Sequence, residues 1–253
     1  MNWLARWLGR PPPAPIDSAL WQRQLRRIDG AAALPAERVA RWHQLCARFL
    51  ADKAITPAAD FTLTQDDRLL IAMLCCEPVI DLGYAWLRGW HQVIVYPGSF
   101  GVRRQHLDED SGVLHEWDDE LAGECWEQGP VILSLDDAIQ AAEAPESGYH
   151  VVAHEIAHKL DLLDGHLDGT PPLPDAAWRR DWIDDFQRAF DALRTQVDGG
   201  RDTAIDPYAG ESPDEFFAVV SEYHFTDPAL LGEAMPEVAA HLERFYHPPQ
   251  APA

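Results

Sequence analysis

Hydrophobic side chains recur every three or four residues along several stretches of the chain, which is the spacing of a helix with one buried face. The longest stretch runs from Pro174 to Val197, and Gly199-Gly200 follows it as a turn. Its apolar positions are Trp178, Trp182, Ile183, Phe186, Phe190 and Leu193. The pattern predicts a packed helix whose aromatic stripe lies in the core. A shorter stretch predicts one more helix from Pro236 to Tyr246, followed by a flexible tail at 248–253.

The first 60 residues show the same spacing twice, after a break at Pro11-Pro12-Pro13. The apolar positions are Trp21, Leu25 and Ile28, and then Val39, Trp42, Leu45, Phe49 and Leu50. We expect two helices here that pack on the rest of the chain. Residues 1–60 hold nine Arg or Lys side chains against five acidic ones, so we expect a basic helical N-terminal segment before a main domain at 61–247.

A short apolar run from Pro130 to Leu135 predicts a β-strand, because it is β-branched near its start and is opened by Gly129-Pro130. Two interpretations stay open. The proline suits an edge strand, to which an extended peptide can add by backbone hydrogen bonding. The apolar residues run on without alternating, which suits an ordinary strand packed on both faces.

The most specific chemical signal is His154-Glu155-Ile156-Ala157-His158, the H-E-x-x-H arrangement of zinc hydrolases. Apolar residues recur at helical spacing around it, and Gly165 is the expected C-terminal stop. Residues four apart lie on one helix face, so His154 and His158 can reach one metal ion while Glu155 lies beside it. A pair of hydrogen-bonded core histidines is the alternative, but the intervening glutamate favours a metal site.

A catalytic zinc site needs a third protein ligand and an open position. Asp164 stands where metzincins place their last ligand. That pattern also needs a glycine where this chain has Asp161, which argues against the metzincin arrangement. Asp161 shares the helix face of both histidines, and we expect it to orient the ring of His158.

The other two candidates, Glu215 and Glu222, lie on a second predicted helix. Ser212 suits its N-cap and Pro213 its first helical residue. Glu215 then falls in the first turn, where a capping-box contact back to Ser212 is the alternative to metal binding. Glu222 lies two turns further along nearly the same face. On spacing alone, either glutamate can be the third ligand, as in gluzincins, whose glutamate comes from a separate helix.

Further motifs are spread over nearly the whole chain. They are Gly89-Trp90, Val93 to Pro97, Gly112 to Glu116, Gly129 to Ser134, His154 to Asp161, Asp206 to Ala209, and Pro213 to Phe217 with Ser221 to Tyr223. This set resembles the Mlc titration factor A family of zinc peptidases, also called DgsA anti-repressors, which is related to the catalytic domain of anthrax lethal factor. The resemblance implies an α+β, zincin-like metallopeptidase domain with a small mixed sheet, an active-site helix and a second, glutamate-bearing helix.

The same resemblance assigns the ligands of one zinc ion. It implies that His154, His158 and Glu215 hold the metal, and that the phenol of Tyr208 lies beside it, facing the developing oxyanion. Glu222 is left as a packing group or one that supports a ligand.

One departure from the family is His150, where members usually carry an asparagine. We expect its side chain near the start of the motif helix.

The motif also predicts the chemistry. Zinc lowers the pKa of a bound water from about 15.7 toward 7, and Glu155 would accept its proton as the general base. We therefore expect a zinc-dependent peptidase acting on a peptide substrate, with aminopeptidase and internal cleavage both open.

The family name implies a second activity, the sequestering of a glucose-responsive, Mlc-like transcriptional repressor of sugar uptake. The alternative function is therefore a non-catalytic protein that titrates a repressor and retains the zinc site.

Composition and charge indicate which kinds of binding partner and which cellular location to expect. The chain has 253 residues and a net charge of -22, and beyond residue 60 it carries 11 basic against 37 acidic side chains, which disfavours direct nucleic-acid binding. No apolar run approaches the roughly 20 residues of a membrane span. The opening Met1 to Arg10 is too short and too interrupted by arginine for a signal peptide, so a cytoplasmic location is expected.

The cysteines form no C-x-x-C pair, which argues against a cysteine zinc site. They are Cys46, Cys75, Cys76 and Cys125. We expect reduced core thiols, with Cys75 and Cys76 at the end of an apolar, helix-like run that begins at Leu69.

Overall fold

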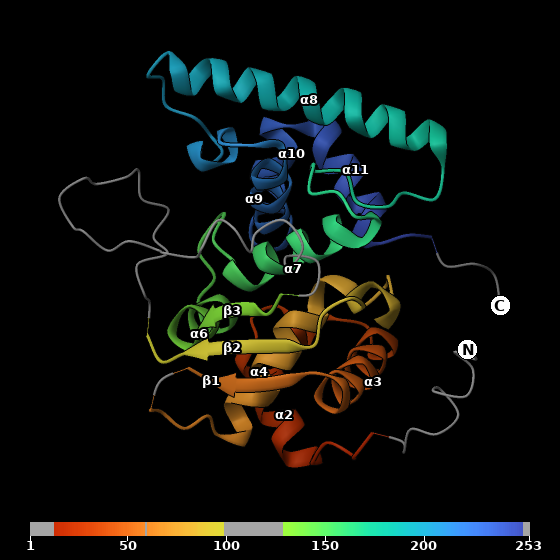
Figure 1. The fold of residues 1–253 in the computed structure, drawn as a ribbon, viewed down its shortest axis with the longest axis vertical. Helices are drawn as coiled ribbons and strands as arrows, with labels where there is room; N and C mark the ends of the chain where they lie inside the picture. Colours follow the sequence, from red (N-terminus) through yellow and green to blue (C-terminus); the bar gives the residue numbers. More distant parts are fainter. Residues whose placement is uncertain (1–12, 59, 99–128, 250–253) are drawn as a thin grey trace.

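The computed structural model describes residues 13–58, 60–98 and 129–249, in which helices surround a small β-sheet (Figure 1). The α-helices are α2 (Ser18–Arg27), α3 (Ala36–Asp52), α4 (Gln65–Cys76), α6 (Leu135–Glu143), α7 (Val151–Asp161), α8 (Ala176–Asp198), α9 (Pro213–Thr226), α10 (Pro228–Ala234) and α11 (Pro236–Tyr246). Short 3-10 helices are η1 (Ala31–Ala33), η2 (Glu77–Val79), η3 (Tyr84–Leu87), η4 (Leu162–Asp164) and η5 (Pro207–Gly210). The motif Gly112 to Glu116, Cys125 and the ends of the chain lie outside the described residues. Among the described helices, none has both the length and the apolar character needed to cross a membrane.

The sheet of the described residues has three strands in the order β1-β2-β3, namely β1 (Ala54–Pro57), β2 (Gln92–Tyr96) and β3 (Val131–Ser134). Both pairings are parallel, with Ile55 opposite Val93 and Val93 opposite Val131. The expected mixed sheet is therefore wrong for this part of the chain. Between β1 and β2 the chain passes through α4, η2 and η3, and a long connection of this kind can return the chain to start the next strand at the same end.

The strand expected at Pro130 to Leu135 is confirmed, although it ends at Ser134 and Leu135 begins α6. In the described residues β3 is an edge strand, since only β2 pairs with it. Its side chains are nevertheless mostly buried, with Val131 and Leu133 in the core. Each of the two interpretations thus captures one property of this strand.

The two helices expected in the first 60 residues are α2 and α3, and Trp21, Trp42 and Phe49 are buried as predicted. Trp42 donates from Nε1 to the backbone oxygen of Met73 on α4 at 2.9 Å, which fixes α3 against the core. Leu50 is exposed, contrary to the predicted stripe. This segment is also not purely helical, because β1 belongs to the sheet, and the sheet thus spans the expected boundary at residue 60.

Helix α4 contains the apolar run that was expected to be helical, and every residue from Leu69 to Cys76 is buried. It begins with a capping box between Thr64 and Asp67. Cys46, Cys75 and Cys76 are free thiols in the core, as predicted.

The C-terminal half confirms the predicted helices α8 and α11, and α11 has the expected bounds. The aromatic stripe of α8 lies in the core, where the rings of Trp182 and Phe186 stack at 4.1 Å. Ile183 is the exception at 39% exposure, because it follows Trp182 by one residue and so points about 100° away from the buried face. Gly199 and Gly200 form the expected turn, and α10 is a helix that the pattern did not predict.

Helix α7 lies between the sheet and the C-terminal helices. In Figure 1 the strands follow one another from β1 to β3, α7 lies beyond β3, and α9, α11 and α8 lie beyond α7. Contacts join α7 to β3 on one side and to α9 on the other. The core is thus continuous across the molecule, and α7 and α9 pack directly together at its centre.

Gly169 joins the three helices around this centre. Its N–H donates to Asp161 Oδ2 on α7 at 2.7 Å, and its carbonyl accepts from Trp182 Nε1 on α8 at 3.0 Å. Its φ is +77°, and a Cβ added there would lie 2.3 Å from the backbone oxygen of Pro213 at the start of α9. Only glycine fits this position without movement of the helices.

We predict that Gly169→Ala lowers the free energy of unfolding by about 3 kcal/mol, because left-handed strain of roughly 1–2 kcal/mol adds to overpacking of roughly 1–3 kcal/mol. Gly200→Ala is the matched control, since its φ is +63° but nothing lies within 4 Å of an added Cβ. Urea unfolding of both variants measures the difference. Equal losses of stability would show that the clash with Pro213 is unimportant.

Candidate metal centre

Helix α7 carries the two histidines of the H-E-x-x-H motif on one face. The ring centroids of His154 and His158 are 4.8 Å apart, and their Nε2 atoms are 3.1 Å apart. The helix begins after His150, whose Nδ1 accepts from the backbone N–H of Ala153 at 3.1 Å. The α-helix ends at Asp161, and η4 carries the chain to Gly165, which is left-handed at φ 92° and is the predicted stop.

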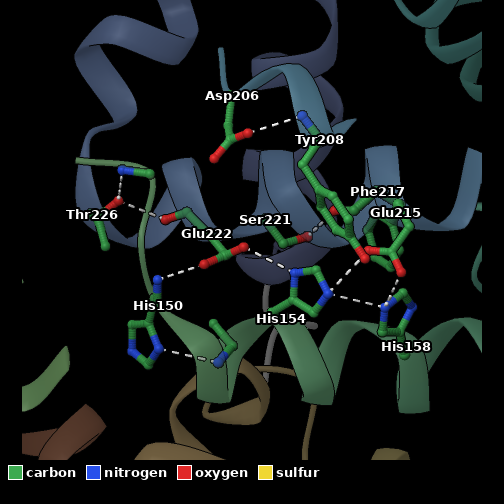
Figure 2. Close-up of polar contacts among 12 residues, drawn as sticks. His150, His154, His158, Asp206, Tyr208, Glu215, Phe217, Ser221, Glu222 and Thr226 are labelled. Atoms are coloured by element: carbon green, nitrogen blue, oxygen red, sulfur yellow. Dashed lines mark hydrogen bonds and ion pairs between the residues drawn. The ribbon is translucent and has the colours of Figure 1, made fainter. Parts of the chain in front are cut away.

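Helix α9 brings Glu215 to the same point. Ser212 is its N-cap and Pro213 its first residue, as the sequence predicts, and the Ser212 hydroxyl accepts from Glu215 N–H at 3.4 Å. The Glu215 side chain turns toward α7: Oε2 lies 3.1 Å from His154 Nε2, and Oε1 lies 3.6 Å from His158 Nε2. Figure 2 shows this convergence of three side chains from two helices.

Glu222 approaches His154 from the other side of its ring (Figure 2). It is fully buried; Oε1 lies 2.9 Å from His154 Nδ1, and Oε2 accepts from the backbone N–H of His150 at 2.6 Å. An ionised carboxylate can only accept hydrogen bonds, so Nδ1 of His154 carries the proton. The Nε2 lone pair then faces Glu215 and His158. The two glutamates that spacing could not distinguish therefore occupy different places, one on each ring nitrogen.

The donor atoms of His154, His158 and Glu215 fit a metal ion. One ligand atom from each lies within 4.8 Å of the other two. The 3.1 Å between the two Nε2 atoms is close to the edge of a zinc tetrahedron, which is about 3.3 Å for Zn–N bonds near 2.05 Å. Glu215 Oε2 is buried with no hydrogen-bond partner among the described residues. Two imidazoles and one carboxylate form a ligand set of catalytic zinc sites, which keep their remaining position open.

Burial and charge oppose each other in this cluster. Burial lowers the pKa of His154, and the contact with Glu215 only partly offsets this effect. Burial acts in the same direction on His158, but hydrogen bonding and charge from Glu215 outweigh it, so the pKa of His158 is raised. Burial would raise the pKa of Glu215, yet the imidazoles of His154 and His158 beside it hold this pKa well below its usual range. Glu215 is therefore ionised and supplies the negative charge that favours a cation.

Tyr208 lies at the border of the cluster, on η5. Asp206 caps this turn by accepting from the backbone N–H of Tyr208 at 2.9 Å, and its own N–H donates to the Tyr223 hydroxyl at 3.1 Å. The half-buried Tyr208 ring lies 6.3 Å from the ring of His154. Asp206 was noted only as part of the motif Asp206 to Ala209 and was given no role, although an aspartate directly before a proline at a helix start is a capping signal.

Glu155 lies between the two histidines in the sequence and is half-buried. Its negative charge opposes the lowering of the pKa of His154 by burial and adds to the raised pKa of His158. Glu155 is thus electrostatically coupled to both histidines without being one of the three grouped donors.

The structure assigns Asp161 a different contact from the one expected. Its Oδ2 accepts from Gly169, and neither its Oδ1 nor Nδ1 of His158 has a hydrogen-bond partner among the described residues. Burial raises the pKa of Asp161 to about 7, although the Gly169 N–H acts in the opposite direction. Through the hydrogen bond from Gly169, Asp161 anchors the loop that follows α7 to the end of that helix.

Two further residues lie away from the cluster. Asp164 is exposed, and its Oδ1 accepts from the backbone N–H of His166, so it is not a ligand in this arrangement. His150 is buried at the start of α7, with Nε2 3.5 Å from Glu77 Oε2. This agrees with its expected place near the helix start.

Comparisons with known proteins agree with the resemblance drawn from the sequence. The family described as glucose-regulated metallo-peptidase M90 matches residues 4–247. Mlc titration factor A of Edwardsiella ictaluri (strain 93-146) is 35% identical over 250 residues, which cover 96% of this chain and 93% of that protein. The protein of the same name from Enterobacter sp. (strain 638) is 34% identical over 96% of this chain and 91% of its own length. The one from Yersinia pestis (strain Pestoides F) is 35% identical over 97% of this chain and 89% of its own length. The chain therefore belongs to the glucose-regulated metallopeptidase M90 family.

Proposed function

We propose that this protein is a zinc-dependent peptidase with a zincin-like catalytic centre, in which His154, His158 and Glu215 hold one zinc ion. The observation that carries the proposal is the convergence of two Nε2 atoms and one carboxylate within 4.8 Å, on two helices that pack together. Membership of a metallopeptidase family supports the same conclusion. Zinc would supply a reactive water near neutral pH, because the metal lowers the pKa of a water ligand.

The remaining roles belong to side chains around the ligands. Glu155 would take the proton of the attacking water and pass it to the leaving amine, since a carboxylate beside the ligands is the general base of H-E-x-x-H enzymes. Glu222 holds the proton on Nδ1 of His154 and so keeps Nε2 available. Tyr208 would donate from its hydroxyl to the developing oxyanion, and one such donor contributes roughly 3–4 kcal/mol.

A peptide substrate would bind in extended form along β3. This strand contacts α7 and has one unpaired edge among the described residues, so backbone hydrogen bonds to a substrate are available there. Both an aminopeptidase and an internal cleavage mode are consistent with such a site.

We also propose that the chain binds a Mlc-like repressor in the cytoplasm, because the relatives with about 35% identity are named Mlc titration factor A. The strongly acidic chain argues against direct nucleic-acid binding, so a repressor would be held by protein contacts.

Three glutamine variants separate metal binding from catalysis. We expect Glu215→Gln to lose one equivalent of zinc and all peptide cleavage, and Glu155→Gln to keep that zinc while cleavage falls by at least about 100-fold. Glu237→Gln, exposed on α11, is the control and should change neither property. Zinc content of the purified proteins and cleavage of a panel of amino-acid and peptide amides measure both. Full turnover by Glu155→Gln, or full zinc content in Glu215→Gln, would refute the assigned roles.

Glu222→Gln tests the contact behind His154. A glutamine side chain has one acceptor oxygen in place of two, so it cannot reproduce the two hydrogen bonds from His154 Nδ1–H and His150 N–H. The ring of His154 is then held less firmly in its orientation. We expect zinc affinity to fall by about 10–100-fold, the usual effect of losing such a supporting carboxylate. Competition with a chromophoric chelator measures the affinity. An unchanged affinity would contradict the positioning role.

Repressor binding and cleavage should be separable. We expect Glu155→Gln to capture purified Mlc repressor as well as the unaltered chain does, because the substitution is isosteric and removes only the base. Co-elution in gel filtration measures capture. If repressor binding disappeared together with cleavage, the two activities would share the catalytic group and the separate binding function would be wrong.

A further inference from the structure

A second group of metal-ligand side chains lies at the far end of α9. His224 follows Glu215 by more than two helical turns, roughly 13 Å along the helix axis. Glu243 and His247 come from the last turn of α11 and the residue after it. One ligand atom from each of the three lies within 4.8 Å of the other two. Two helices thus converge here on two histidines and a carboxylate, as α7 and α9 do at the first centre.

His224 is a buried imidazole whose ring nitrogens make no hydrogen bond to any described residue. It is 8% exposed and packs between aromatic side chains. Its ring stacks on Tyr246 with the ring centroids 5.1 Å apart, and it makes an edge contact with Phe225 at a centroid distance of 5.0 Å. Among the described residues no donor or acceptor competes for these ring nitrogens, so a lone pair of His224 is left for a metal ion.

His247 resembles His154 in its surroundings. Its Nδ1 lies 3.2 Å from Asp81 Oδ2 and 3.4 Å from Nη2 of Arg38. The shorter contact, to a carboxylate that can only accept, favours the tautomer with the proton on Nδ1. Nε2 is then a lone-pair donor with no hydrogen bond among the described residues. A histidine that donates one ring N–H to a carboxylate and keeps the other ring nitrogen free has the arrangement typical of a metal ligand.

Two arginines lie near this group, but both are engaged. Asp81 accepts from Arg38 at 3.0 Å and from Arg41 at 2.5 Å. Glu243 forms no ion pair with a described residue and borders an open groove of about 440 Å³, which Arg38, Arg41, Asp81 and His247 also line. The groove admits an ion and its remaining water ligands from solvent.

We propose that His224, Glu243 and His247 form a second metal site, for zinc or another late first-row divalent cation. Two imidazoles and one carboxylate are the donors that such ions prefer. The site would tie α9 to α11 and, through Asp81 and its two arginines, to α3 in the N-terminal segment. Its three ligands differ from those of the first centre, so it does not depend on the proposed peptidase function.

Zinc titration of the full, metal-stripped chain by calorimetry tests the proposal. We expect two equivalents in the unaltered chain, and loss of one in Glu243→Gln and His247→Gln. The affinity of that equivalent should fall at least about tenfold, since even losing a supporting hydrogen bond costs about 10–100-fold. Glu237→Gln on the same helix and His166→Gln at an exposed site are matched controls and should bind as the unaltered chain does.

A second measurement separates the two sites. In Glu215→Gln, whose first centre is disabled, added zinc should still raise the thermal unfolding midpoint. The double variant Glu215→Gln/His247→Gln should show no such rise. A single equivalent in the unaltered chain, or two equivalents retained by both Glu243→Gln and His247→Gln, would overturn the second site while leaving the first untouched.

Discussion

The candidate centre depends on the hydrogen bond between the buried carboxylate of Glu222 and Nδ1 of His154. A fully buried carboxylate costs several kcal/mol unless strong donors compensate it. Here the donors are Nδ1 of His154 and the backbone N–H of His150 at the start of α7. One group on α9 thereby fixes both where α7 begins and how the ring of His154 is oriented. Glu215, two turns earlier on α9, meets the opposite nitrogen of the same ring.

Much of this arrangement follows from periodicity and local chemistry. The aromatic spacing predicts α8, Ser212-Pro213 predicts the start of α9, and four-residue spacing places His154 and His158 on one face. Spacing could not decide between Glu215 and Glu222, because both lie on nearly the same face of α9. The distinction arises from the His154 ring, whose two nitrogens face opposite directions, and only tertiary packing determines which carboxylate meets which nitrogen.

Other features depend on contacts that a linear pattern does not contain. The resemblance implied a mixed sheet, whereas the described strands pair in parallel, and no linear pattern shows how the connections return the chain. Asp161 lies on the predicted face of α7, but its carboxylate accepts a hydrogen bond from Gly169 and makes none with His158. Gly169 is left-handed and packs on Pro213. Ile183 and Leu50 illustrate a smaller limit, since a hydrophobic residue at the border of a stripe can lie in solvent. The group of His224, Glu243 and His247 was missed because its members are spread over two helices, and the four-residue step from Glu243 to His247 is its only local signal.

We propose that α7 and α9 together hold a zinc ion between His154, His158 and Glu215. A crystal structure of the zinc-loaded chain, with diffraction recorded on both sides of the zinc absorption edge, tests it most directly. We predict an anomalous peak within about 2.0–2.2 Å of Nε2 of His154, Nε2 of His158 and a carboxylate oxygen of Glu215. Zinc-replete crystals with no anomalous peak between these three side chains would contradict the claim.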